Sequence, residues 1–188
     1  MRLNWIHELS LGYSPDWSWR QPQKLDLGSG PKVIYISHRG NIHGPNTALE
    51  NHPKYIDEAI DLGFDVEVDL WVTELGAYLG HDAPAYPVNK EWFDERITKL
   101  WVHCKNSEAI ELAHNNGLHY FFHSTDDYTL TSYGFVWPYP GNKMATRKCI
   151  SVLPERVDGF GGDRLIYTEY AGVCSDYIEG VRNDVQRN

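Results

Sequence analysis

The pattern of hydrophobic and polar positions changes near residue 31. The first 30 residues contain the stretch SPDWSWRQPQKLDLGSG, which is rich in Pro, Gly and Ser and shows little periodicity. After it, short apolar runs alternate with stretches of helical spacing. The pattern therefore predicts a partly ordered N-terminal extension over residues 1–30 and a single folded domain over residues 31–188.

Apolar runs typical of β-strands recur along this domain. The clearest is FDVEVDLWV, residues 64–72, because Val66, Val68 and Leu70 alternate with acidic residues at period two. Similar runs predict further strands at residues 33–37, 100–103, 118–123, 134–137, 149–153, 165–168 and 171–175.

Helical spacing separates several of these strands. Residues 49–64, LENHPKYIDEAIDLGF, show helical spacing through Tyr55, Ile56, Ala59 and Ile60, and Gly63 is suited to end that helix. Helices are also predicted at residues 90–97 and 106–117, with Ser107 as the N-cap of the latter. Alternating strands and helices predict an α/β fold with parallel strands. Seven or eight units favour a compact TIM-like (β/α) barrel, with shortened or missing helices because such barrels usually need about 250 residues.

Composition narrows the functional classes. The chain has 188 residues, is 41% hydrophobic and has a net charge of −9, which argues against nonspecific binding to nucleic acid or to an anionic membrane. Its three cysteines are far apart and form no CxxC pair. No run approaches the roughly 18 apolar residues of a membrane span, and no signal peptide is evident. We expect a cytoplasmic protein without a membrane span that acts on a small molecule.

Polar residues follow the predicted strands at their C-terminal ends. In (β/α) barrels the C-terminal face carries the active site. The residues at these positions are His38, Arg39, Glu67, Asp69, His103, Lys105, His123, Trp137, Glu155 and Asp176.

Glu67 and Asp69 share one face of the predicted strand at residues 64–72. A solvated edge strand would explain two adjacent carboxylates, and so would a bound cation. If they bind a cation, their hard oxygen ligands suit Mg²⁺ or Ca²⁺. His38 and His81 are then suited to general acid–base catalysis near that ion. Arg39 and Lys105 supply fixed positive charge for an anionic group, so the set as a whole suits a phosphodiester substrate.

Five short motifs resemble those of glycerophosphodiester phosphodiesterases, in the same order and with roughly the same spacing between residues 33 and 178. They are HRG at 38–40, LEN at 49–51, the E-x-D of Glu67 and Asp69, HD at 81–82 and CSDYI at 174–178. The resemblance implies a TIM-like barrel of the phospholipase C-like phosphodiesterase superfamily. It also implies metal ligation by Glu67 and Asp69, acid–base roles for His38 and His81, and hydrolysis through a cyclic phosphate.

The chain departs from that family on the strand at residues 100–103. The family usually has E-x-K there, whereas this chain has HCK, so Lys105 matches and His103 replaces a carboxylate. Imidazole suits Zn²⁺, Mn²⁺ or Fe²⁺ better than Mg²⁺ or Ca²⁺. Three alternatives follow: the metal differs, Glu155 or Asp176 completes the ligand set, or water is the third ligand.

Two more residues complete the expected site. Glu50 would support the site or bind a substrate hydroxyl, and Trp137 would stack on a sugar or polyol. The motifs do not separate three functions: a glycerophosphodiester phosphodiesterase, a related barrel lyase or phosphodiesterase acting on a lipid or polysaccharide phosphodiester, and a non-catalytic barrel that binds a sugar or phosphate.

Overall fold

The structure is a computed structural model that describes residues 33–142, 144, 146–156 and 169–187. The N-terminal extension expected over residues 1–30 and the strand expected at residues 165–168 lie outside the described residues.

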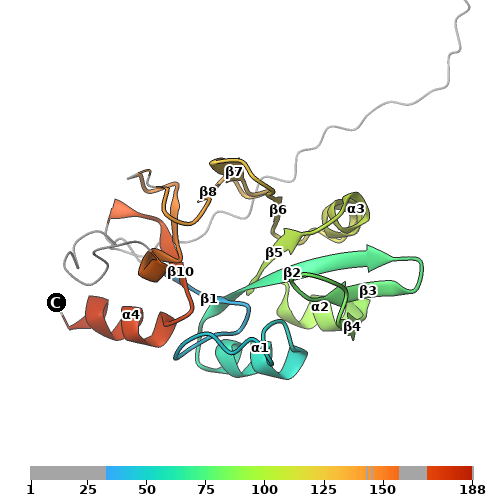
Figure 1. Cartoon of the computed structure of the whole chain (residues 1–188), viewed down its shortest axis with the longest axis horizontal. Coiled ribbons are helices and arrows are strands. Elements are labelled where there is room, and N and C mark those ends of the chain that lie inside the picture. The colour runs from blue at the N-terminus through green and yellow to red at the C-terminus, as the bar shows by residue number, and fades with distance from the viewer. Residues whose placement is uncertain (1–32, 143, 145, 157–168, 188) are drawn as a thin grey trace, which may run out of the picture.

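Six parallel strands form the body of the sheet, in the order β6-β5-β2-β1-β10-β9 (Figure 1). Each coincides with a strand that the apolar pattern predicts. Their bounds are Ile34–His38 for β1, Asp65–Thr73 for β2, Leu100–Cys104 for β5, Tyr120–Phe122 for β6, Ile150–Val152 for β9 and Gly172–Ser175 for β10.

Antiparallel strands extend this sheet in ways that the sequence did not indicate. β3 (Gly76–Leu79) pairs with the far end of β2, and β4 (Tyr86–Val88) pairs with β3. A separate hairpin joins β7 (Tyr128–Leu130) to β8 (Val136–Pro138). β8 matches the strand predicted at residues 134–137, whereas β3, β4 and β7 are too short and too exposed to give a clear alternating pattern.

The mixed α/β class is confirmed, but a closed barrel is not shown. The main sheet ends at β6 on one side and at β9 on the other. Within the described ranges, β8 touches β9 through an isolated bridge between Val136 and Cys149, and no strand ladder links the hairpin to β6. The hydrogen-bonded sheet is therefore open at this point.

The helices agree with the predicted positions, with one helix added at the C-terminal end. The helix bounds are Pro53–Asp61 for α1, Lys90–Arg96 for α2, Ser107–Asn115 for α3 and Ile178–Gln186 for α4, with the 3₁₀ turn η1 at Pro154–Arg156. The N-cap predicted at Ser107 is wrong. Asn106 caps α3 instead by accepting from the Ala109 amide, and it also bonds both backbone groups of Val72, which ties the helix to β2. In the described ranges, no helix has the length and apolar character needed to cross a membrane.

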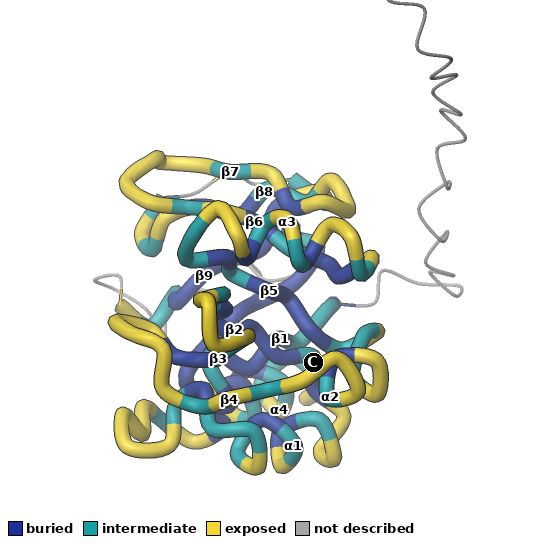
Figure 2. The backbone as a smooth tube through the Cα atoms, turned by 90° about the vertical axis from the view of Figure 1, so that its right-hand side faces the viewer, coloured by how far each residue is buried: buried dark blue, intermediate teal, exposed yellow. Residues whose placement is uncertain are grey.

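Alternation along the strands divides their side chains between two faces. Val66, Val68 and Leu70 are fully buried in the larger core cluster. This cluster also contains Cys104 of β5 and the buried residues of α1 and α3. The opposite, inner face carries a second cluster: Ile36, Trp101, Phe121, Trp137, Ile150, Val152, Leu153 and Cys174. Figure 2 shows β1, β2 and β5 buried at the centre, with β4 and β7 at exposed margins.

The candidate site residues lie one step beyond the inner apolar cluster. His38 follows Ile36 by two positions, His103 follows Trp101, and Asp176 follows Cys174, so each pair shares a face. The apolar cluster therefore forms a floor, and the polar residues lie above it at the C-terminal strand ends.

Candidate active site and metal centre

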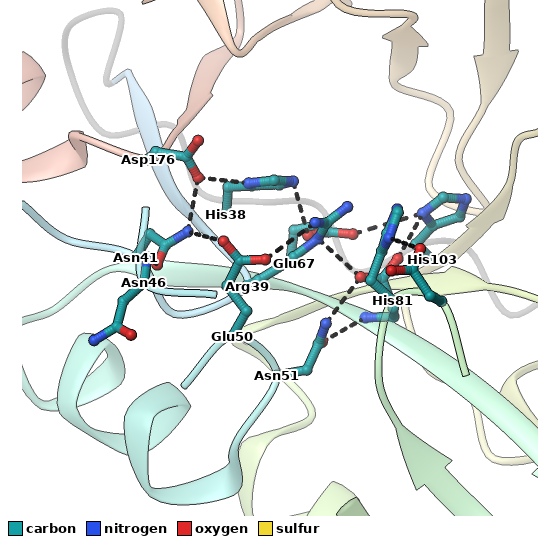
Figure 3. A network of polar contacts seen from close by, with 12 residues as sticks. His38, Arg39, Asn41, Asn46, Glu50, Asn51, Glu67, His81, His103 and Asp176 are labelled. Carbon is teal, nitrogen blue, oxygen red and sulfur yellow. Dashed lines mark hydrogen bonds and ion pairs between the residues drawn. The ribbon is translucent and has the colours of Figure 1, made fainter. Parts of the chain in front are cut away.

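Strand register brings the polar residues of three strands together. His38 on β1 is the register partner of Glu67 on β2, and Asp69 is the register partner of His103 on β5. In Figure 3 the side chains of His103, Glu67 and His38 form a row that continues to Asp176 at the end of β10. The carboxylates are thus on the inner face near His38, as the sequence predicts, and not on a solvated edge.

Glu67, Asp69 and His103 form a group that can hold a metal ion. Their potential ligand atoms all lie within 4.8 Å of one another. Glu67 is 2% exposed and Asp69 is fully buried, yet Glu67 Oε2 and Asp69 Oδ1 have no hydrogen-bond partner among the described residues. Lys105 Nζ and His103 Nδ1 still lie 3.4 Å and 3.1 Å from Asp69 Oδ1, so the uncompensated oxygen is that of Glu67. A buried carboxylate oxygen without a partner is energetically costly, and a divalent cation between the two carboxylates would remove that cost. The residues present therefore fit a divalent cation.

The electrostatics of the two carboxylates differ. Burial, reinforced by the neighbouring charge of Asp69, raises the pKa of Glu67 above its usual value. Burial acts on Asp69 in the same direction, but His103, Arg39 and Lys105 outweigh it and lower the pKa of that carboxyl well below its usual range. Asp69 is therefore ionised near neutral pH, whereas a cation bound next to Glu67 would favour the ionised form of that carboxyl group.

Cations and an amide surround Asp69. Arg39 Nε lies 2.9 Å from Asp69 Oδ2, and Lys105 Nζ lies 3.4 Å from Oδ1. Asn51 makes a reciprocal pair, with its Oδ1 accepting from the Asp69 amide and its Nδ2 donating to Asp69 Oδ2, both at 2.9 Å. These contacts fix the position of the carboxylate and leave Oδ1 directed toward His103.

An unusual loop conformation places these groups. Arg39 and Asn51 both have positive φ, at 56° and 64°, and the Asn51 amide bonds the Arg39 carbonyl. Gly40, at φ 92°, allows close contact with α1, because a Cβ there would lie 2.7 Å from Tyr55 Cδ1. The HRG motif is thus explained by a turn that packs against α1 and presents Arg39 to Asp69.

His38 is held by Asp176. Its Nδ1 lies 2.6 Å from Asp176 Oδ1, and both side chains are almost fully buried. Although burial opposes ionisation, hydrogen bonds from His38, Asn41 and Arg156 lower the pKa of Asp176 to about 2. The ionised carboxylate can only accept, so Nδ1 carries the proton. His38 Nε2 is then directed toward Glu67, 4.0 Å from Oε2.

Glu155 and Glu50 support other side chains. Glu155 accepts from Ser175 Oγ at 3.0 Å and from the Asp176 amide at 2.7 Å, and it does not belong to the group of potential metal ligands found in the described residues. The structure therefore does not bring Glu155 together with the potential metal ligands, contrary to the expectation from its position after a strand. Glu50 bonds Arg39 and Asn41, in agreement with a supporting role.

His81 lies on the loop after β3, at the edge of the site. Its side chain is 43% exposed, and its Nδ1 lies 2.7 Å from Asp82 Oδ1. Partial burial and the positive charges of Arg39 and Lys105 lower its pKa. His81 is therefore a neutral imidazole near pH 7, close to the two cations that surround Asp69.

A cavity of about 560 Å³ opens above this row. Its lining includes His38, His81 and His103, the two cations that contact Asp69, and the segment Trp137–Pro140. Trp137 is 5% exposed, and its ring stacks on Phe121 at 4.4 Å between centroids. Trp137 therefore lines the cavity while its ring belongs to the inner apolar cluster, and its stacking on a substrate stays a prediction.

Several supporting residues were not singled out from the sequence. Asn41 donates to both Glu50 and Asp176, Arg156 pairs with Asp176 at 3.0 Å, and Asn51 braces Asp69. Asn41 and Asn51 lie in loops without periodicity. The only signals for them were that Asn41 directly follows HRG and that Asn51 ends the LEN motif. Arg156 lies in η1 and had no motif around it.

Comparisons of the chain with protein-family models, with curated proteins and with solved structures found no match. The motif resemblance thus stays a prediction, and the function has to be argued from the geometry of the site.

Proposed function

We propose that this protein is a metal-dependent phosphodiesterase that cleaves a glycerophosphodiester-type bond by histidine acid–base catalysis. One observation carries the proposal: His38, whose Nδ1 is bonded to Asp176, lines one cavity together with the buried carboxylate of Glu67 and the cations Arg39 and Lys105, and Asp69 holds both cations from behind. Neither a structural role nor simple sugar binding needs all of these groups together.

A divalent cation held by Glu67 and Asp69 would supply Lewis-acid stabilisation of charge on a phosphoryl oxygen. The chain's own residues account for the rest. Arg39 and Lys105 line the cavity beside Asp69 and are placed to bind the remaining phosphate oxygens. Asp69 also binds the side chains of Arg39 and Lys105, so these two side chains are ordered before substrate binds. This order reduces the reorganisation needed at the transition state.

The two histidines are suited to different proton transfers. His81, whose pKa is lowered, is neutral near pH 7 and is suited to accept the proton of the attacking glycerol hydroxyl. His38 is held at Nδ1 by the carboxylate of Asp176, which leaves Nε2 free to face the substrate, so we assign to Nε2 the proton transfer to the leaving alkoxide. Attack by the adjacent hydroxyl gives a cyclic phosphate, which water then opens with the two roles reversed.

We also propose that the sheet forms a contracted TIM-like barrel. The Val136–Cys149 bridge and the hydrogen bond from the Val136 amide to the Lys148 carbonyl, at 2.6 Å, link β8 to the β9 side. The Ser132 amide donates to the Tyr120 carbonyl at 2.7 Å, which links the hairpin to β6. These contacts support a closure made by loops where a longer chain would have full strands.

The direct test is an assay of the metal-stripped protein with Mg²⁺, Ca²⁺, Mn²⁺ or Zn²⁺ added back. Glycerophosphocholine and bis(p-nitrophenyl) phosphate serve as substrates. We expect metal-dependent turnover that falls by at least about 10²-fold in His38→Ala and in Glu67→Gln. The matched controls are His114→Ala and Glu111→Gln, both on the exposed surface of α3. Turnover that survives in both site variants would contradict the proposal.

A further inference from the structure

The orientation of the His103 ring is fixed from two sides. Its Nε2 lies 3.1 Å from the backbone carbonyl oxygen of His123 on the neighbouring chain segment. A carbonyl only accepts, so Nε2 carries a hydrogen. The ring also stacks on Phe121, with centroids 4.9 Å apart and planes inclined by 12°. Together the bond and the stacking hold the other nitrogen, Nδ1, toward the carboxylates.

Nδ1 of His103 faces both carboxylates. It is 3.1 Å from Asp69 Oδ1 and 3.7 Å from Glu67 Oε1. Two ligand atoms each about 2.1 Å from one metal ion are about 3.0–3.4 Å apart in octahedral or tetrahedral geometry. The 3.1 Å spacing to Asp69 Oδ1 is therefore that of two ligands around one ion, and the 3.7 Å spacing to Glu67 Oε1 lies just beyond this range.

We propose that His103 Nδ1 is the third protein ligand and that the site selects a borderline transition-metal ion, such as Mn²⁺, Fe²⁺, Co²⁺ or Zn²⁺, over Mg²⁺ and Ca²⁺. Imidazole nitrogen suits those ions, whereas Mg²⁺ and Ca²⁺ favour all-oxygen sites. A hydrogen bond to the second ring nitrogen of a ligating histidine, as the His123 carbonyl accepts here, fixes the tautomer that ligation requires. The inference rests on the metal site of the proposed function and is independent of the reaction.

The proposal is tested by metal binding to the full chain, measured by titration calorimetry of the stripped protein with Mn²⁺, Zn²⁺, Mg²⁺ and Ca²⁺. We expect Mn²⁺ and Zn²⁺ to bind at least 10-fold more tightly than Mg²⁺ and Ca²⁺. His103→Glu restores an all-oxygen set, so it should reduce that preference at least 10-fold. His123→Gln, on the same cavity wall, keeps the backbone carbonyl and should leave the order of affinities unchanged.

Two readouts need only the wild-type chain and remain decisive if a variant fails to fold. Nitrogen NMR of the metal-free protein should show the His103 proton on Nε2 when the ring is neutral. Added Co²⁺ should give visible absorption bands of a site with a nitrogen ligand. Tighter binding of Mg²⁺ or Ca²⁺, a neutral Nδ1–H tautomer, or an unchanged metal order in His103→Glu would overturn the proposal. Selective binding without turnover would contradict the proposed function alone.

Discussion

His38 and Asp176 lie at the ends of β1 and β10, and the histidine Nδ1 is 2.6 Å from the carboxylate Oδ1. The two strands are parallel neighbours, with Ser37 and Ser175 in register, so the residue that follows each serine lies on the same side of the sheet. This register is what turns a strand-end histidine into one with a defined tautomer. Asp176 is therefore a positioning residue for His38.

Replacing Asp176 by Asn tests this role. The amide keeps the size of the side chain but removes the carboxylate that accepts the hydrogen bond from His38 Nδ1. We expect kcat to fall by about 10²–10⁴-fold, while KM changes by less than about threefold because Asp176 does not face substrate. Steady-state kinetics of the metal-loaded variant checks this, with Asp61→Asn on the exposed side of α1 as the control. A rise in KM with kcat unchanged would contradict a positioning role.

Asn51→Gly should weaken metal binding. The substitution removes both hydrogen bonds to Asp69, while the backbone φ of 64° is one that glycine adopts readily. Loss of such a supporting contact usually costs about 10–100-fold in metal affinity. Calorimetric titration with Mn²⁺ measures the change, and urea unfolding of the metal-free variant shows whether the fold is retained. Unchanged affinity in a folded variant would show that Asp69 is fixed by Arg39 and Lys105 alone.

His119 should make the protein sensitive to mild acid. Its ring is buried between Tyr133, at 4.3 Å, and Trp101, at 4.1 Å, and burial lowers its pKa to about 3. The unfolded chain, with a histidine pKa near 6.5, then binds more protons between about pH 6.5 and pH 3. The stabilisation is complete above this window and is lost as pH falls through it, by at most about 1.4 kcal/mol per pH unit.

The matched variant for this effect is His119→Phe, which keeps the ring stacking and removes the titrating group. Urea unfolding at several pH values between 7 and 4.5 gives the free energy of unfolding of both proteins. We expect the wild type to lose stability more steeply than the variant over this range. Equal slopes would mean that His119 accepts a proton without leaving its buried position.

Gly40→Ala should destabilise the fold more than Gly63→Ala. Both glycines have nearly the same positive φ, at 92° and 89°, so the backbone penalty of about 1–2 kcal/mol is shared. A Cβ at Gly40 meets Tyr55 Cδ1 at 2.7 Å, whereas a Cβ at Gly63 meets nothing within 4 Å. Chemical denaturation of the two variants isolates the packing term. Equal losses would show that the HRG turn can move away from α1 without cost.

The sequence predicted the strand and helix positions well because their signals are local. Alternation in β2 identified the face that Glu67 and Asp69 share, and the two-residue spacing of His103 and Lys105 placed both beside Asp69. Sheet closure depends on contacts between segments distant in sequence, so periodicity cannot decide it. The β3–β4 hairpin was not predicted for a related reason, since its short exposed strands lack an apolar face.

Supporting groups were harder to predict than the groups they support. Asn51 acts through a positive-φ conformation that no pattern of hydrophobicity records, although asparagine tolerates it better than most residues. Glu155 shows the opposite case, in which a residue was expected to be a metal ligand and is a supporting group instead. It follows a strand end, as a ligand would, but its carboxylate is taken up by Ser175 and the Asp176 amide. Position after a strand therefore indicates the correct face of the sheet, without specifying which atoms meet there.

The measurement that tests the central claim most directly is phosphorus NMR of glycerophosphodiesters incubated with the metal-loaded protein. A panel that varies the alcohol half covers the part of the substrate that the site does not define. The account predicts loss of the diester signal, a transient cyclic phosphate, and accumulation of glycerol phosphate that depends on His38. A protein that binds its metal ion by calorimetry but leaves every diester of the panel intact would contradict it.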